Sequence, residues 1–323
     1  MSDENQHWVP RFLIRNFADN DGRVFCLDFH TDEVSKRPPR RAASERGFND
    51  FTLDGEVVTF EDKLEKIETK AAPILKQIVS AKSLVGVGAA QRQCVAEFMA
   101  AQSFRTKAFY EGLIEKPTRQ EFGRIFQQLW DGAFFTAGEI ARRDWALMVI
   151  EGETDVFYLG DNPVVLQRTD NPKDGRNLGF DVKGVEVFMP LSPVCALFMP
   201  CNATSADRIA RYDTAMELHR AVRSAALRGV PGGTTELQTA QLVISRLHPL
   251  ILAFRTGEPL RATSENVENV NYLQCSWAHS AIYSNRRDFA FARRVFREHP
   301  QYRTVPKTSL LRFGAEQASS GGA

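Results

Sequence analysis

The most constraining feature of this sequence is a change of pattern near Ala146. Before it, long stretches carry apolar residues three and four positions apart, which is typical of amphipathic helices. After it, strand-sized apolar runs continue as far as Met199, and helical spacing returns from about Ser205. Helices and strands that are segregated along a chain favour an α+β fold over a doubly wound sheet. We therefore expect an α+β protein whose helical N-terminal and C-terminal parts flank a central, mainly antiparallel strand-rich region.

These patterns also predict individual elements. A helix begins near Thr59, and Pro73 should kink or divide it. Further helices are expected over Ala89–Glu111, Thr118–Asp144, Ser205–Leu227, Thr234–Arg246, Ser264–Ala278 and Arg286–Arg297. Strands are expected over Arg23–Phe29, Glu56–Phe60, Leu147–Ile150, Val156–Leu159, Val164–Gln167, Val185–Met189, Val194–Met199 and His248–Phe254. Together they predict one domain over residues 1–310, with a helical block at about 59–145, a strand-rich centre at about 146–200, a helical part at 205–300 and a flexible tail at 311–323.

Composition and charge exclude several classes of protein. The chain has 323 residues with 41 basic and 40 acidic side chains, and the formal charge of +1 excludes a globally basic nucleic-acid coat. A hydrophobic content of 43% excludes disordered and collagen-like classes. The polar N-terminal residues do not form a signal-peptide pattern, and no apolar run is long enough to span a bilayer. We expect a soluble, cytoplasmic protein with no membrane partner.

Metal and cofactor signals are weak. The five cysteines are scattered without a CxxC pair, so we expect no structural zinc. Three carboxylates, Glu61, Glu65 and Glu68, follow one another at helical spacing and could bind a divalent cation. The lysines that interleave with them favour a solvated helix face instead. Phosphate-loop and zinc-protease motifs are missing from the sequence, and we predict no cofactor.

Gln102 and Arg105 are polar residues on an otherwise apolar side of a predicted helix. They share that side with Phe98 and Phe109, since the four positions are spaced four, three and four apart. A buried guanidinium needs a carboxylate or a ligand anion, because an unpaired buried charge is too costly. The spacing leaves both a structural ion pair and an anion-binding role open.

Asp161 and His7 are the two candidates for acid–base chemistry. Asp161 lies in the turn Gly160–Pro163 between two predicted strands, where a carboxylate is held rigidly yet within reach of a substrate. The alternative is an Asx turn, in which the side chain caps its own backbone. We expect Arg105 to lie against Asp161. His7 could act as a general base with a neighbouring aspartate, or it could be an ordinary packed histidine.

Arg286, Arg293 and Arg297 fall on one side of a predicted amphipathic helix. With the arginines of the Lys36–Arg46 loop, they could contact nucleic-acid phosphates. An ordinary surface helix is the alternative interpretation.

Several motifs along the chain together resemble a known family. The opening segment is HWVPRFLIRNF, from His7 to Phe17. Further motifs are Gln102, Arg105-Thr106, Gly160-Asp161-Asn162-Pro163, Pro190-Leu191-Ser192-Pro193, Asn269-Val270-Asn271 and Tyr283-Ser284. They resemble the "HYVPQFYLRNF" opening, the "SDNP" turn and the later motifs of the bacterial family catalogued as domain of unknown function 4238. This chain departs from the pattern with Trp8 in place of Tyr and Gly160 in place of Ser.

The resemblance implies a soluble bacterial protein of a family sometimes met near mobile-element or phage-defence genes. Its polar motif residues are remote from one another in sequence, which indicates a shared pocket more readily than a shared core. They are His7, Asn16, Gln102, Arg105, Asp161, Asn162 and Ser192.

Two functional hypotheses follow. The first is a hydrolase for a nucleotide or nucleic-acid phosphate, with phage defence as a candidate role. In it His7 or Asp161 is the catalytic base, and Arg105 holds the anion. The remaining substrate-binding residues would be Gln102, Asn16, Asn162 and Ser192. The alternative is a non-catalytic ligand-binding, nucleic-acid-binding or sensing protein, in which the polar cluster recognises a ligand or holds the fold together. The oligomeric state is not predicted.

Overall fold

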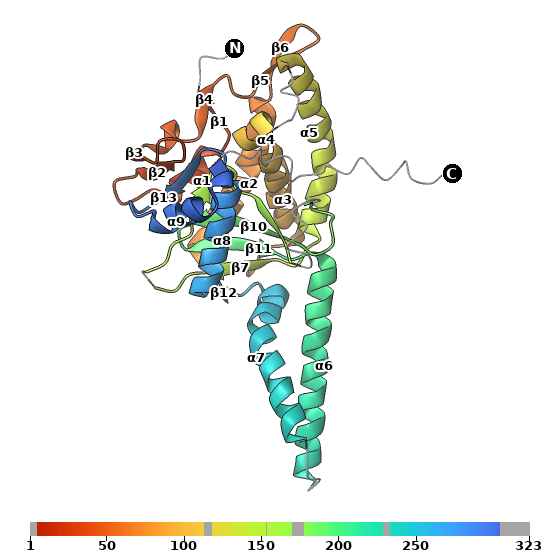
Figure 1. The fold of residues 1–323 in the computed structure, drawn as a ribbon. Helices are drawn as coiled ribbons and strands as arrows, with labels where there is room; N and C mark the ends of the chain where they lie inside the picture. The colour runs from red at the N-terminus through yellow and green to blue at the C-terminus, as the bar shows by residue number, and fades with distance from the viewer. Residues whose placement is uncertain (1–4, 113–117, 153, 170–177, 229–232, 304–323) are drawn as a thin grey trace, which may run out of the picture.

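The computed structural model describes residues 5–112, 118–152, 154–169, 178–228 and 233–303, and it confirms the α+β class. Figure 1 shows a body that contains the strands and most of the helices, from which a long helical hairpin projects. The hairpin consists of α6 (Asn202–Leu227) and α7 (Thr234–Thr256), and we call it the arm. The predicted tail at 311–323 lies outside the described residues, and the single domain over 1–310 stays a prediction.

The body is built on a five-stranded sheet in the order β12-β7-β11-β10-β9. Its pairings are antiparallel, except that β12 runs parallel to β7. Every residue of β7, β10 and β11 is buried, because helices cover both faces. The continuous apolar runs of β7 and β11 reflect this, and β10 is apolar apart from Glu186 and Ser192. The strands are β7 (Ala146–Val149), β9 (Val165–Arg168), β10 (Val185–Ser192), β11 (Cys195–Met199) and β12 (Leu260–Arg261).

Smaller sheets hold the N-terminal segment. A four-stranded sheet has the order β3-β2-β13-β8, and two ribbons pair β1 with β4 and β5 with β6. The short helix α1 (Arg11–Arg15) packs Leu13 and Ile14 into a core that it shares with Leu159 and Tyr283. The bounds are β1 (Asn5–His7), β2 (Val24–Asp28), β3 (Val34–Arg37), β4 (Ser44–Arg46), β5 (Asp50–Leu53), β6 (Glu56–Thr59), β8 (Leu159–Gly160) and β13 (Ala281–Ser284), with 3₁₀ turns at Pro39–Arg41 and Pro300–Arg303.

The N-terminal helical block contains α2 (Glu61–Ala81), α3 (Ala89–Phe104), α4 (Lys107–Gly112) and α5 (Arg119–Ala141). Pro73 lies inside α2 without dividing it. The single helix expected over Ala89–Glu111 is wrong, since α3 ends at Phe104 and Arg105 is its C-cap residue. Thr106 Oγ1 accepts a hydrogen bond from the Phe109 amide and so caps the start of α4.

The C-terminal part contains the arm, α8 (Ser264–Trp277) and α9 (Ala290–Glu298). The strand expected over His248–Phe254 is wrong, because these residues complete α7. Ile251 and Phe254 are three apart and both buried, so the apolar run covers one side of a helix. Helix α7 ends at Gly257, whose φ of 78° terminates it. Among the described helices, none is long and apolar enough to cross a membrane.

Candidate functional site

Three of the predicted site residues meet where β1 crosses α3. Gln102 Nε2 donates to the carbonyl of Trp8 at 2.7 Å, and Arg105 Nη2 donates to the carbonyl of His7 at 3.3 Å. Arg105 Nη1 donates to Glu68 Oε1 of α2 at 2.6 Å. The prediction that Arg105 lies against Asp161 is therefore wrong. Arg105 meets Glu68 of α2 instead, and Asp161 is held by amides of the connection between α8 and β13.

The carboxylates of α2 extend this polar cluster. Glu61 Oε2 accepts from Asn49 Nδ2 at 2.6 Å, and burial raises the pKa of Glu61. The interpretation of Glu61, Glu65 and Glu68 as a solvated helix face holds only for Glu65, which is exposed. Among the described residues, no group of three or more His, Cys, Asp and Glu side chains could hold a metal ion.

His7 is half-buried in the same cluster. Burial lowers the pKa of its imidazole, and the nearby positive charge of Arg105 lowers that pKa further. Its Nε2 atom is buried and has no hydrogen-bond partner among the described residues. The neutral ring has the protonation state that a general base needs, but a base must also reach a substrate proton.

Asp161 belongs to a different part of the body. It is fully buried, and Oδ1 accepts from the His279 amide at 2.6 Å. Oδ2 accepts from the Ser280 amide at 2.9 Å, from Ser280 Oγ at 2.7 Å and from the Ala281 amide at 3.2 Å. Asp161 therefore holds the connection between α8 and β13, and its partners are neither Arg105 nor its own backbone.

Of the other motif residues, Asn16 and Asn162 also join segments that are remote in sequence, and Ser192 makes a local contact. Asn16 Nδ2 donates to the carbonyl of Leu191 at 2.9 Å, which ties the N-terminal segment to β10. Asn162 Nδ2 donates to the carbonyl of Trp277 at 3.3 Å. Ser192 Oγ accepts from the Val194 amide at 3.3 Å within the hairpin of β10 and β11. These contacts fit residues that fix the fold.

The three arginines proposed for nucleic acid do not share one helix. Helix α9 begins at Ala290, so Arg286 precedes it. Arg286 Nη1 donates to the carbonyl of Thr154 at 2.9 Å, and Arg293 Nη2 donates to that of Asp32 at 2.9 Å. Arg297 is exposed on α9.

A cavity of about 540 Å³ lies between the five-stranded sheet, the base of the arm and α8. Its apolar side includes Met148, Phe188, Phe198, Leu250 and Leu260. Phe188 and Phe198 are cross-strand partners, and their rings stack with centroids 5.0 Å apart. We call it the arginine cavity, because its lining also includes Arg208, Arg246 and Arg261.

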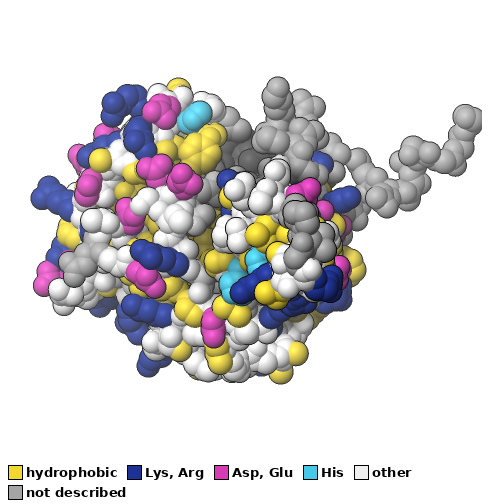
Figure 2. Space-filling view, turned by 90° about the horizontal axis from the view of Figure 1, so that it is seen from below, with side chains coloured by type: hydrophobic (Ala, Val, Ile, Leu, Met, Phe, Trp, Pro, Cys, Tyr) yellow, Lys and Arg dark blue, Asp and Glu magenta, His cyan; other side chains and the backbone are white. Residues whose placement is uncertain are grey.

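The arginines of this cavity differ in their pairing. Arg208 Nη2 contacts Glu186 Oε1 at 2.8 Å, whereas its Nη1 is buried and has no hydrogen-bond partner among the described residues. Arg261 is 74% exposed and pairs with Glu151 at 3.3 Å. Arg246 is exposed on α7. Figure 2, which looks toward the tip of the arm, shows several basic side chains on and beside it.

Two further groups line the arginine cavity. Thr263 and Asn266 form the capping box at the start of α8, so the positive end of this helix lies at the cavity. Asn269 exchanges hydrogen bonds of 2.9 Å and 3.3 Å with Gln167 of β9. Gln167 is in turn the cross-strand partner of Glu186.

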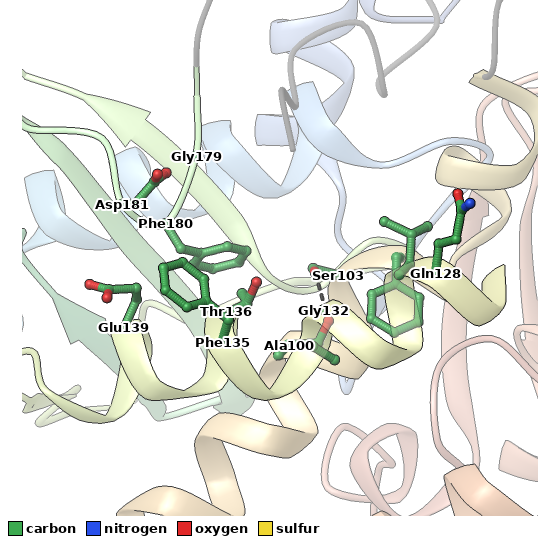
Figure 3. Close-up of a pocket in the computed structure, with 13 residues that line it drawn as sticks. Ala100, Ser103, Gln128, Gly132, Phe135, Thr136, Glu139, Gly179, Phe180 and Asp181 are labelled. Atoms are coloured by element: carbon green, nitrogen blue, oxygen red, sulfur yellow. Dashed lines mark hydrogen bonds between the residues drawn. The ribbon is translucent and has the colours of Figure 1, made fainter. Parts of the chain in front are cut away.

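A second cavity, of about 490 Å³, lies between α3, α5 and residues 179–181. Figure 3 shows the carboxylates of Glu139 and Asp181 at one end and Gln128 at the other. Phe104, Phe135 and Phe180 contribute its aromatic surface, and none of the described residues that line it is Lys or Arg. An anionic ligand therefore fits the arginine cavity better.

Comparison with known proteins places the chain in a family. Residues 5–288 match the profile described as protein of unknown function (DUF4238). The chain belongs to the DUF4238 family. The match includes both the opening motif at His7 and the arginine cavity, and no curated protein or solved structure matches the chain.

Sequence reasoning missed Glu68 as the partner of Arg105 and all the charged residues of the arginine cavity. In the sequence, Glu68 is only one of several charged residues at helical spacing, and nothing marks it as the partner of Arg105. Arg208, Arg246 and Arg261 come from α6, α7 and β12, and only the tertiary structure brings them to one cavity. No local motif marks them.

Proposed function

We propose that this DUF4238 protein is a non-catalytic binding protein whose ligand is a phosphate-bearing small molecule held in the arginine cavity. The supporting observation is the charge of the lining, whose described residues include three arginines and a single carboxylate, that of Glu186. Arg208 brings a buried Nη1 without a partner, and such a donor gains strongly from a charged acceptor. The cavity volume of about 540 Å³ lies within the usual range for small-molecule sites.

The contacts of the motif residues give less support to the hydrolase hypothesis. Glu68 already neutralises Arg105, which is 2% exposed and poorly placed to hold a substrate anion. Asp161 accepts four hydrogen bonds from the α8–β13 connection, which fits a structural carboxylate better than a catalytic base. Hydrolysis of a nucleotide or nucleic-acid phosphate, and a role in phage defence, stay predictions.

Calorimetric titration with ribose 5-phosphate tests the proposed binding. We expect saturable binding that Arg246→Ala weakens about tenfold, because one charge-assisted hydrogen bond contributes about 1.5–3 kcal/mol. Arg220→Ala, an exposed arginine farther along α6, is the matched control and should bind as the wild type does. Equal binding of neutral ribose, or full affinity in Arg246→Ala, would contradict the proposal.

A further inference from the structure

We propose that the ligand of the arginine cavity is a nucleoside monophosphate whose base carries an exocyclic amino group. This inference rests on the proposed function and names the ligand class of the same site. It follows from three surfaces of different chemistry that the cavity combines, namely an apolar aromatic side, a cationic rim and a polar wall.

The apolar side accounts for the base. Phe188 and Phe198 stack on each other on adjacent strands, and Met148 and Leu250 continue the surface. The two rings are 5% and 7% exposed, and the guanidinium of Arg208 lies over Phe198. The apolar surface open to a base is therefore mainly that of the half-buried Leu250 and Leu260.

The cationic rim accounts for the phosphate. Arg246 and Arg261 are exposed side chains of α7 and β12 at the same cavity, and the capped start of α8 lies there too. Arginine side chains and helix N-termini both favour phosphate, the first through bidentate hydrogen bonds and the second through backbone amides. A monophosphate places its charge at one end of the ligand, as this arrangement requires.

The polar wall accounts for the amino group. Glu186, Gln167 and Asn269 form a continuous row, because Glu186 and Gln167 are cross-strand partners and Gln167 bonds to Asn269. Arg208 occupies Oε1 of Glu186, and we assign the second carboxylate oxygen to the ligand. A carboxylate accepts hydrogen bonds from exocyclic amino groups of bases and repels a keto oxygen at the same position.

Calorimetric titration of the full chain with AMP, IMP and ribose 5-phosphate tests this inference. AMP and IMP have the same shape but differ in the amino or keto group of the base. We expect AMP to bind at least tenfold more tightly than ribose 5-phosphate and about tenfold more tightly than IMP. If ribose 5-phosphate binds as tightly as AMP, or IMP as tightly as AMP, the inference is overturned while the proposed function stands.

Two variants locate the effect. Glu186→Gln keeps the shape of the side chain and should remove the preference for AMP over IMP; Glu258→Gln, an exposed glutamate beside β12, should keep it. Glu186→Gln also removes the charged partner of Arg208, so thermal unfolding is used to check that this variant is folded. The comparison of AMP with IMP on the wild-type protein does not depend on this variant. AMP binding that Arg246→Ala leaves unchanged would place the nucleotide elsewhere and overturn both proposals.

Discussion

Arg105 and Glu68 form an ion pair of 2.6 Å that joins the C-terminus of α3 to the middle of α2. Arg105 is 2% exposed, and its second nitrogen donates to the carbonyl of His7 in β1. One guanidinium therefore fixes three segments, two helices and the N-terminal strand. Its planar fork allows both contacts at once, which the single ammonium of lysine would not reproduce.

Replacing Glu68 by glutamine should destabilise the protein by about 3 kcal/mol. The substitution leaves the buried charge of Arg105 without its counter-charge, a change that costs about 3–5 kcal/mol in fully buried pairs; Glu68 itself is 26% exposed. Urea unfolding measures the difference. Glu65→Gln changes an exposed glutamate of the same helix and should stay within about 0.5 kcal/mol of the wild type. Equal stability of the two variants would mean that the ion pair contributes nothing.

Asp161→Asn should also destabilise the protein, by about 3 kcal/mol or more. All four groups that contact the carboxylate donate hydrogen bonds, and the amide nitrogen of asparagine would meet some of them as a second donor. Equilibrium unfolding in urea gives the value. Asp288→Asn is the control, since Asp288 is exposed and accepts from one amide at the start of α9. A stable Asp161→Asn protein would show that this carboxylate does not hold the α8–β13 connection.

The fold class was predictable because patterns of buried residues persist over many positions. The apolar runs of β7 and β11 and the apolar stripes of α2 and α5 can be recognised even where the ends of these elements are misplaced by a few residues. The end of α7 was misread as a strand because residues His248–Phe254 form a mostly apolar, strand-sized run, whereas the helix continues through Pro249. The two-residue strands β8 and β12 are defined by their partners, so the isolated sequence carries little sign of them.

The candidate site was less predictable for a physical reason. The family motif identified polar residues that hydrogen-bond remote segments to one another, such as Asn16 and Asp161. A residue that binds a ligand uses the same kinds of polar side chain, so the motif alone does not distinguish the two roles. Arg105 meets a carboxylate 37 positions earlier in the chain, and only the tertiary packing of α3 and α2 brings the two together. The arginine cavity depends on the placement of the arm against the sheet, which no local spacing encodes.

His7 should make the protein sensitive to mild acid. Burial, and secondarily the charge of Arg105, lowers the pKa of the folded imidazole below its ordinary value of about 6.5, so the unfolded chain binds the proton more readily. The contribution of His7 to stability is therefore present above pH 6.5 and is lost as the pH falls below it toward the folded pKa. Thermal unfolding, measured at pH 7.5 and at pH values below 6.5, gives the loss of stability on acidification. This loss should be smaller in His7→Gln than in the wild type. His30→Gln, an exposed histidine beside β2, should not reduce the loss.

Gly257→Ala should weaken the junction between the arm and the body. Gly257 has a φ of 78°, and a Cβ there would lie 2.7 Å from the backbone carbon of Leu84, so alanine meets both backbone strain and a collision with main-chain atoms. Gly86 provides a matched control, since its φ of 81° imposes the same strain while a Cβ would meet nothing within 4 Å.

The difference between these two variants isolates the collision. Gly86→Ala should cost about 1–2 kcal/mol through backbone conformation. Gly257→Ala should cost about 1–3 kcal/mol more, because Leu84 also donates its amide to the carbonyl of Gly257 at 2.8 Å and cannot move away without loss of that bond. Urea unfolding of both variants measures the two costs. Equal destabilisation would show that the backbone at Leu84 can move away from the added Cβ without cost, and that the arm does not pack tightly against the body at Gly257.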